Sequence, residues 1–361
     1  MLYRAIGLMS GSSLDGLDIA FVELHENAGQ WSYEILEADC YPYSNEWIAR
    51  LKNAVDLSAL EYQLLHVDYG HYLGQQVNKF IEAHQLQYKV ALVASHGHTT
   101  FHIPAKKMTA QLGDGAALAA ETQLPVVIDL RAMDVAFGGQ GAPIVPIGEK
   151  LLLGDYAYFL NLGGIANISL NRENYTAFDV CPANRVLNML VAELDKEYDA
   201  GGEMARTGAV NDELLEQLNA LPYYQQPFPK SLANDFGTGI VYPLIKKATL
   251  KTEDALSTYA EHIAVQIKNA ISSDPIVTGS RLLVTGGGAF NTFLVERLAA
   301  HLKEQKIEVI IPDKKLINYK EALVMALIGV LRWRQEYNVF SSVTGAQRDS
   351  IGGALWTGQE A

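Results

Sequence analysis

The chain has 361 residues, of which 49% are hydrophobic and 19% are charged, and its formal net charge is −13. This length allows two domains of ordinary size, and this composition is that of a globular protein rather than a disordered one. The negative charge, without a run of Lys or Arg, argues against nucleic acid or an anionic membrane as partner.

The first half of the chain predicts strands followed by alternating helices and strands. Strands are expected at 3–9, 17–24, 31–39 and 90–94, with a long helix at about 58–84. Apolar and aromatic residues between Tyr62 and Tyr72 recur near the helical period, so we assign this stripe to the core. The segment 137–143 contains three glycines and Pro143, and it is the clearest candidate hinge.

The second half starts this pattern again. We expect a hairpin at 158–170, then a strand that ends at Asp179. The remaining elements are helices and strands in alternation: helices at about 183–196, 212–221, 256–271, 291–301 and 320–336, and strands at 281–285 and 309–311. This restart predicts two similar α/β domains that face each other across a cleft.

Two hairpin tips carry small polar residues where a hairpin usually carries only turn formers. Their glycines and N–H groups are suited to bind an anion, most often the phosphates of a nucleotide, and the duplication indicates phosphoryl transfer. The alternative is a pair of ordinary turns. The candidate residues are Gly11, Ser12, Ser13, Leu14, Asp15, Gly16, Leu17 and Asp18 in the first tip, and Asn161, Gly163 and Gly164 in the second. Asp15 or Asp18 would hold Mg²⁺, through water.

A third glycine cluster follows the strand 281–285. It offers a helix N-terminus and room for a base or ribose, although it matches neither a Walker A loop nor a dinucleotide fingerprint, and a tight packing turn is the alternative. Its candidate nucleotide-binding residues are Gly286, Gly287, Gly288 and Asn291.

Asp179 is the candidate general base. It stands at the predicted end of a strand and before a helix, where a carboxylate can accept a proton in a cleft. On position alone, a helix N-cap is the favoured alternative.

Further polar residues are candidates for binding a sugar. Arg131 is suited to a carboxylate, or else to a surface ion pair with Asp134. Glu321 begins an apolar helix, where it is either a site residue or a first-turn acid. The segment 95–99 has two histidines, and we expect it to form a polar rim rather than a metal site.

The chain resembles the anhydro-N-acetylmuramic acid kinases, a family within the actin and sugar-kinase superfamily of duplicated ribonuclease-H-like domains, over almost its full length. The similar motifs are Met9-Ser10-Gly11-Ser12-Ser13-Leu14-Asp15-Gly16-Leu17-Asp18, Ser95-His96-Gly97-His98-Thr99, Gly138-Gly139-Gln140-Gly141-Ala142-Pro143, Asn161-Leu162-Gly163-Gly164-Ile165-Ala166-Asn167, Phe178-Asp179-Val180-Cys181-Pro182-Ala183-Asn184, Pro229-Lys230-Ser231, Gly286-Gly287-Gly288-Ala289 and Val343-Thr344-Gly345-Ala346. The resemblance implies two such domains around a central cleft, at 1–137 and 138–339, with about 340–361 packing back on the first.

The chain departs from the family pattern at several positions. Ser12 replaces Thr and His98 replaces Gln. Val180 and Cys181 replace Thr-Gly, and the segment 233–235, which contains Asn234, replaces Gly-Arg-Glu. The last change removes a cation and bears on the choice of substrate or nucleotide.

The resemblance implies an ATP- and Mg²⁺-dependent enzyme of peptidoglycan recycling. Water would open the 1,6-anhydro ring of 1,6-anhydro-N-acetylmuramic acid, and O6 would receive the γ-phosphoryl group, giving N-acetylmuramate 6-phosphate and ADP. Asp179 would be the base and Arg131 would bind the lactyl carboxylate. The other sugar-binding candidates are Ser95, His96, Gly97 and Glu321.

Two other functions remain open: a kinase for another amino sugar, and a sensor that binds sugar or nucleotide without catalysis. The longest apolar stretch, 322–331, is far shorter than the roughly 20 residues of a membrane span. With two lone cysteines and no signal-peptide pattern, we expect a cytoplasmic protein, with a homodimer implied by the resemblance.

Overall fold

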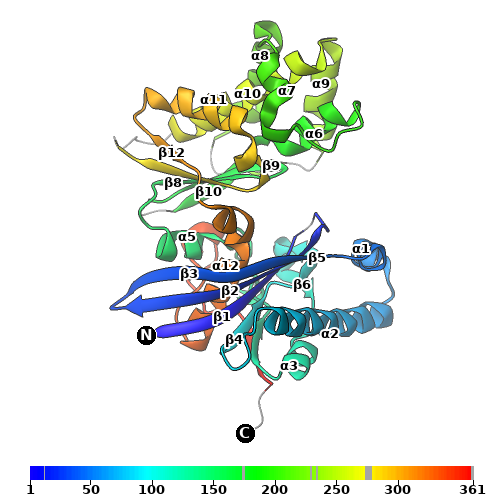
Figure 1. Ribbon diagram of the computed structural model, residues 1–361, viewed down its shortest axis with the longest axis vertical. Helices are drawn as coiled ribbons and strands as arrows, with labels where there is room; N and C mark the ends of the chain where they lie inside the picture. Colours follow the sequence, from blue (N-terminus) through cyan, green and yellow to red (C-terminus); the bar gives the residue numbers. More distant parts are fainter. Residues whose placement is uncertain (12, 173–174, 228–229, 233–234, 273–278, 359–361) are drawn as a thin grey trace. The chain divides into compact units, whose positions relative to one another are not determined.

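The computed structural model describes residues 1–11, 13–172, 175–227, 230–232, 235–272 and 279–358 (Figure 1). The chain divides into two compact units, one of Met1–Leu153 with Tyr319–Ala361 and the other of Gly154–Asn318. These limits differ from the expected ones at 137/138 and 339/340. The glycine-rich segment 137–143 is bonded into the first unit, where the N–H of Gly141 donates to Asp134, so the chain leaves that unit only after Leu153.

The first unit is built on a six-stranded sheet with the order β13-β7-β4-β1-β2-β3. β1 pairs antiparallel with β2 and parallel with β4, so the chain makes a meander and then adds parallel strands through helices. The strands are β1 (Leu2–Ser10), β2 (Gly16–Asn27), β3 (Gln30–Pro42), β4 (Leu92–Ser95), β7 (Pro125–Ile128) and β13 (Ala354–Thr357), and a separate hairpin is formed by β5 (His98–Ile103) and β6 (Met108–Leu112).

Helices cover both faces of this first sheet. The α2 residues Leu65, Tyr69 and Phe80 belong to one apolar cluster with Ile6 and Leu17 of the sheet. On the other face, a Cβ at Gly7 would collide with Ala322, so α12 packs directly on β1. The helices of this unit are α1 (Asn45–Lys52), α2 (Ala59–Ala83), α3 (Gly115–Thr122), α4 (Ala132–Ala136), α5 (Pro146–Leu152), α13 (Ser341–Thr344) and the part of α12 (Lys314–Trp333) that begins at Tyr319, with 3-10 turns η1 (Ala54–Asp56) and η2 (Pro104–Lys106).

The long helix α2 forms as predicted, with Ser58 and Glu61 in a capping box at its start. The expectation that the whole stripe from Tyr62 to Tyr72 lies in the core is wrong in part. Leu64 is 57% exposed and Val67 is 39% exposed, because the buried face follows Leu65, Tyr69 and Leu73 instead.

The second unit repeats the same topology with the strand order β10-β9-β8-β11-β12. β8 (Tyr158–Leu162), β9 (Ile165–Leu170) and β10 (Thr176–Pro182) form the antiparallel meander, and β11 (Arg281–Thr285) and β12 (Glu308–Ile310) extend it in parallel. The predicted fold class, a duplicated α/β fold of the ribonuclease-H-like type, is therefore confirmed.

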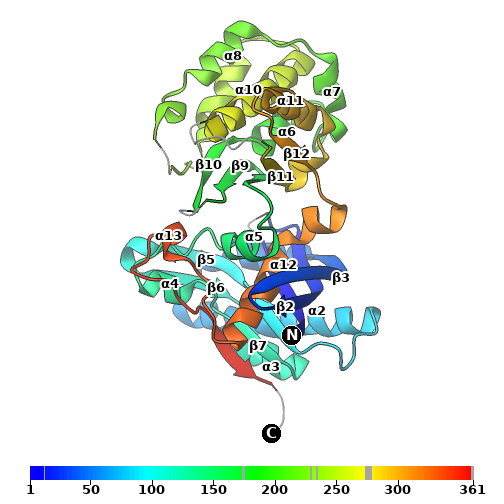
Figure 2. The same ribbon diagram turned by 90° about the vertical axis from the view of Figure 1, so that its left-hand side faces the viewer.

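The core of the second unit lies between this sheet and a helical layer (Figures 1 and 2). Its central helix α10 (Thr252–Ser272) is buried over most of its length, and Tyr259 donates a hydrogen bond to the carbonyl of Pro182 at the end of β10. The other helices are α6 (Asn184–Ala192), α7 (Glu203–Thr207), α8 (Asp212–Asn219), α9 (Tyr242–Lys247) and α11 (Thr292–Lys303), with short turns η3 (Ala200–Gly202), η4 (Pro222–Gln225), η5 (Phe236–Val241) and η6 (Gly287–Phe290).

Candidate functional site

The first hairpin tip lies between β1 and β2. The Ser13 hydroxyl donates to the Asp15 carboxylate over 2.6 Å, and both side chains are exposed. Leu14 has a φ of 59° and its N–H donates to the carbonyl of Gly11. Ser12 lies outside the described residues. The tip thus presents a hydroxyl and a carboxylate, the two groups predicted for a phosphate and metal site.

Two residues of this tip have structural reasons to be present. Leu17 is 1% exposed and belongs to the core of the sheet. A Cβ at Gly16 would lie 2.6 Å from the Cys40 sulfur, so glycine is required there by the neighbouring strand β3. If Gly16 and Leu17 contact a nucleotide, as predicted, they can do so only through their main-chain atoms.

The surroundings of Asp18 perturb its carboxyl group. Burial raises its pKa to about 6, a thiol hydrogen bond from Cys40 opposes this shift, and the charges of Asp15 and Glu321 add to it. Two carboxylates whose charges repel fit a bound Mg²⁺, which is held by carboxylate oxygens and keeps several waters. No cluster of three or more His, Cys, Asp or Glu side chains that could hold a metal occurs within the described residues.

The predicted sugar-binding residues His96 and Arg131 contact each other. The Arg131 Nε–H donates to His96 Nε2 over 2.8 Å, and His96 Nδ1 lies 2.9 Å from the carbonyl of Gly97. Because a carbonyl only accepts, Nδ1 carries a proton. Nε2 accepts from Arg131 and therefore carries none, so the ring is neutral. Burial and the Arg131 charge lower the pKa of His96 to about 3, and burial lowers the pKa of Arg131 to about 10.

This arrangement excludes the surface ion pair considered for Arg131. A second guanidinium N–H donates to the carbonyl of Gly141, and Asp134 bonds to Gly141 and Thr344 instead. Among the described residues, no further acceptor bonds to the guanidinium, which leaves N–H groups available to an anion.

Ser95 and Gly97 shape the turn that presents His96. The N–H of Gly97 donates to the Ser95 hydroxyl over 3.1 Å, and Gly97 has a φ of 68° with no room for a Cβ beside the carbonyl of Leu112. This turn interrupts the chain between β4 and β5, so His96 and His98 have different neighbours. They form no shared metal site.

His98, which stands where the family has Gln, joins a buried network. Its Nδ1 lies 3.1 Å from the Ser10 hydroxyl, which accepts a hydrogen bond from Tyr43 over 2.8 Å. Burial lowers the pKa of His98. The network connects the last residue of β1, next to the first tip, with the first residue of β5.

Glu321 lies within α12, which begins earlier than predicted, at Lys314. The helix departs from regular geometry at Tyr319, so Glu321 follows this kink rather than opening the helix. Burial raises the pKa of Glu321, while the charges of Lys320 and Arg131 lower it. A buried acid coupled to Arg131 is consistent with the predicted place in a polar site.

Asp179 lies inside β10 and not at its end. The register of β10 against β9 shifts between Asp179 and Cys181. The helix that follows begins at Asn184 with Ala183 as its N-cap, so the N-cap alternative for Asp179 is wrong.

The Asp179 carboxylate is fixed by donors on both oxygens. Asn167 donates to Oδ1, while the Ser231 hydroxyl and the N–H of Leu232 donate to Oδ2 over 3.2 and 2.8 Å. The carbonyl of Asp179 accepts from Tyr223 over 2.7 Å. A half-buried carboxylate held in one orientation is the geometry that a general base needs.

The second tip and the third glycine cluster meet in the second unit. A Cβ at Gly286, which has a φ of 81°, would collide with the Asn161 side chain, and a Cβ at Gly288 would lie 2.6 Å from that of Leu162. Asn184 lies beside both segments: its side chain donates to the carbonyl of Leu162 over 3.0 Å, and its amide oxygen would lie 3.0 Å from a Cβ at Gly288. These glycines are required by packing.

Three other glycines have room for a Cβ. Its nearest neighbour would lie 3.4 Å away at Gly163 and 3.8 Å away at Gly164 and Gly287, which is ordinary contact distance, and none of the three has a positive φ. Neither packing nor backbone conformation requires glycine at these positions. Asn291 has a structural role, since its side chain accepts from the N–H of Leu294 at the start of α11.

Sequence reasoning missed three residues of this site. Asn167 and Ser231 donate to Asp179, and Asn184 donates to Leu162 of the second tip and lies beside Gly288. Each of them closes a motif that carried the family resemblance, and this position was the available signal.

Comparison with known proteins decides the family. A family model described as anhydro-N-acetylmuramic acid kinase matches residues 3–358. The chain belongs to the anhydro-N-acetylmuramic acid kinase family. A family member from Francisella tularensis subsp. novicida is 33% identical over 97% of both chains, and one from Sulfurovum sp. is 33% identical over 98% of this chain and 99% of its own.

A solved structure with lower similarity is component A of (R)-2-hydroxyglutaryl-CoA dehydratase from Acidaminococcus fermentans. It is 14% identical, covers 91% of this chain and 97% of its own, and has a TM-score of 0.47. This likeness carries no argument about function.

Membership in the anhydro-N-acetylmuramic acid kinase family makes this protein an enzyme, a phosphotransferase. Within the described residues, no helix has both the length and the apolar character to cross a bilayer. Among the positions where the chain departs from the family pattern, the buried Cys181 lies in β10 at the register shift that follows Asp179. Ala233 and Asn234 lie outside the described residues.

Proposed function

We propose that this kinase hydrolyses the 1,6-anhydro ring of 1,6-anhydro-N-acetylmuramic acid and phosphorylates O6 with ATP. The observation that carries the proposal is the Asp179 carboxylate, which three donors hold in one orientation in the same unit as the glycine loops. A carboxylate that only stabilises a turn does not need donors on both oxygens. A general base needs them, because its carboxylate must stay oriented toward one water molecule.

The first unit supplies the residues for the sugar in this proposal. The guanidinium of Arg131, already oriented by His96 and Gly141, binds the lactyl carboxylate through its remaining N–H groups. The neutral His96 places no second positive charge there. Glu321, whose pKa is raised by burial, is suited to share a hydrogen bond with a sugar hydroxyl or amide.

ATP binds in this proposal through the backbone of the two tips and the third glycine loop. The open positions Gly163, Gly164 and Gly287 allow phosphate or ribose to approach the main chain. Ser13 and Asp15 present a hydroxyl and a carboxylate at the other tip. Bound Mg²⁺ would neutralise charge on the transferred phosphoryl group, and Asp15 and Asp18 are the residues that would hold it through water.

The reaction balances with one water and one ATP. Asp179 accepts a proton from water as the water oxygen bonds to the anomeric carbon and the C1–O6 bond breaks. The released O6 attacks the γ-phosphorus, ADP leaves, and Asp179 gives its proton to the solvent. The products are N-acetylmuramate 6-phosphate and ADP.

The remaining expectations follow from this role. Such a product belongs to the recycling of peptidoglycan and to amino-sugar metabolism, and we propose a cytoplasmic location. A homodimer is likewise a proposal. The family departures at Val180, Cys181 and Asn234 bear on the choice among related sugars.

An ADP-release assay with two sugars tests the proposed function. With ATP and Mg²⁺, we expect release with 1,6-anhydro-N-acetylmuramate and little with N-acetylglucosamine. Release with N-acetylglucosamine alone would identify another amino-sugar kinase. Binding of the anhydro-sugar without ADP release would identify a sensor, and either result overturns the proposal.

A further inference from the structure

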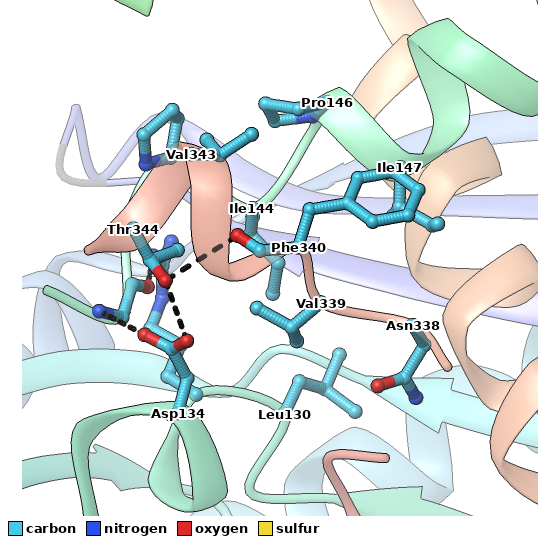
Figure 3. Close-up of a pocket in the computed structure, with 13 residues that line it drawn as sticks. Leu130, Asp134, Ile144, Pro146, Ile147, Asn338, Val339, Phe340, Val343 and Thr344 are labelled. Carbon is cyan, nitrogen blue, oxygen red and sulfur yellow. Dashed lines mark hydrogen bonds between the residues drawn. The ribbon is translucent and has the colours of Figure 1, made fainter. Parts of the chain in front are cut away.

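A buried carboxylate lies at the centre of the glycine-rich loop that follows α4. Asp134 is 1% exposed, and its two oxygens accept from different partners: the Thr344 hydroxyl over 2.6 Å and the N–H of Gly141 over 2.7 Å (Figure 3). A Cβ at Gly139 would collide with this carboxylate, and Gly141 has a φ of 64°. The glycines of the motif are thus explained by a loop that wraps around Asp134.

The loop is also tied to the segment after α13. The N–H of Gln140 donates to the carbonyl of Thr344 over 2.8 Å, and the N–H of Gln347 donates to the carbonyl of Phe137 over 3.2 Å. Segments some 200 residues apart in the chain are therefore joined around one carboxylate, with Thr344 contributing both its hydroxyl and its carbonyl. Two motifs of the sequence, 138–143 and 343–346, meet here.

The loop leads directly to Arg131. The carbonyl of Gly141 accepts from the Arg131 guanidinium, which also donates to His96. The N–H and the carbonyl of Gly141 thus connect Asp134 to Arg131 through a single residue. A shift of Gly141 would move one of the two acceptors that aim the guanidinium.

Apolar side chains surround the hydrogen bond between Asp134 and Thr344. A small pocket lies beside the Asp134–Thr344 pair (Figure 3). Most of its lining is apolar, including Leu130, Ile144, Ile147, Val339 and Val343. Away from water, a hydroxyl–carboxylate bond is strong and costly to lose.

We propose that Asp134 and Thr344 are positioning residues that hold Gly141, and through it Arg131, in the orientation that selects a sugar carrying a carboxylate. The proposal rests on the proposed function, in which Arg131 binds the lactyl carboxylate. It adds a selectivity role for two residues that do not touch the sugar.

The test compares Thr344→Val with Thr344→Ser. We measure the KM and kcat for 1,6-anhydro-N-acetylmuramate, and the inhibition constant of 1,6-anhydro-N-acetylglucosamine, which lacks the lactyl carboxylate. Loss of one buried hydrogen bond to a charged group predicts about a tenfold rise in KM for Thr344→Val, with kcat nearly unchanged. The neutral sugar should bind as before, and Thr344→Ser, which keeps the hydroxyl, should restore the KM.

Ser341→Ala is the matched control, because Ser341 donates to Asp349 over 2.7 Å from the same helix α13 without a bond to the loop. It should lower the melting temperature about as much as Thr344→Val and leave the selectivity unchanged. Equal weakening of both sugars by Thr344→Val, or no weakening of either, overturns the proposal. A wild-type enzyme that binds the two sugars equally would instead refute the carboxylate role of Arg131 in the proposed function.

Discussion

The two units have the same strand order and place different chemistry at the same position. In the first unit, Asp18 pairs with Met9 on one side and with Cys40 on the other. In the second unit, Asn167 pairs with Asn161 and with Asp179. We call each set of three paired residues a row. In both units the row lies one residue pair before the last pair of the hairpin formed by the first two strands.

The side chains in these two rows exchange their roles. In the first unit the central strand carries the carboxylate, Asp18, and the outer strand carries the donor, Cys40. In the second unit the central strand carries the donor, Asn167, and the outer strand carries the carboxylate, Asp179. One scaffold thus provides a half-buried acid with a raised pKa in one copy and a carboxylate fixed by donors in the other. The difference lies in the residues and not in the fold.

Replacement of Asp179 should have the largest effect of the changes to these rows. Asp179→Asn removes the proposed base and should lower kcat about 10²–10⁴-fold, with ATP binding nearly intact. Cys40→Ser changes the equivalent position of the other row, keeps a donor to Asp18, and should stay within a few-fold of wild type. Single-turnover kinetics and nucleotide titration measure both variants. Retained turnover in Asp179→Asn would remove this residue from the role.

Asn167→Ala should have the next largest effect. It leaves Asp179 Oδ1 without its donor, so the carboxylate turns more freely and kcat should fall about 10–100-fold. Ser231→Ala should cost less, because the N–H of Leu232 still binds Oδ2. The kcat values of the two variants give the comparison, and equal effects would contradict the assigned geometry.

Two glycine substitutions separate ligand contact from packing. The Cβ of Gly164→Ala would lie 3.8 Å from its nearest neighbour, in the Arg185 side chain, so the melting temperature should hold while the KM for ATP rises about tenfold. Gly286→Ala meets Asn161 at a positive φ and should cost about 1–3 kcal/mol of stability. Thermal unfolding and steady-state kinetics measure both. An unchanged KM for Gly164→Ala would place the phosphates elsewhere.

The smallest effect concerns the pH dependence of stability. Because the pKa of Asp18 is raised from 3.8 to about 6 in the folded protein, its ionisation opposes folding as the pH rises through this range. Asp18→Asn should therefore gain about 1–2 kcal/mol relative to wild type at pH 7, and little at pH 4. Urea unfolding at the two pH values measures the gain, and an equal change at both would contradict the assigned cause.

The sequence predicted most of the elements because their periodicities and caps are local. The three opening strands, α2 with Ser58 at its N-cap, and β11 at 281–285 all formed where expected. The stripe at Leu64 and Val67 was misassigned because a helical period does not tell which side of the helix meets the sheet. The strand through Asp179 continued further than expected because a register shift lets β10 pass the residue.

The candidate site could be predicted as a set of motifs and not as a set of contacts. His96 and Arg131 were assigned separately, and only the folded chain brings these residues within 2.8 Å. Asp134 is buried by a loop and by a segment near the end of the chain, a pairing that no local pattern records. Glycines required by packing, such as Gly16, could not be distinguished from the open Gly164 without the neighbouring strands.

The fate of the water oxygen tests the central claim most directly. The enzyme turns over 1,6-anhydro-N-acetylmuramate and unlabelled ATP in ¹⁸O-water, and the product is analysed by mass spectrometry before its anomeric oxygen exchanges with solvent. Unlabelled product held in ¹⁸O-water for the same time measures that exchange. The account predicts one ¹⁸O on C1 of the sugar phosphate and none in the phosphoryl group. Label in inorganic phosphate alone, or a phosphorylated sugar without label, would contradict it.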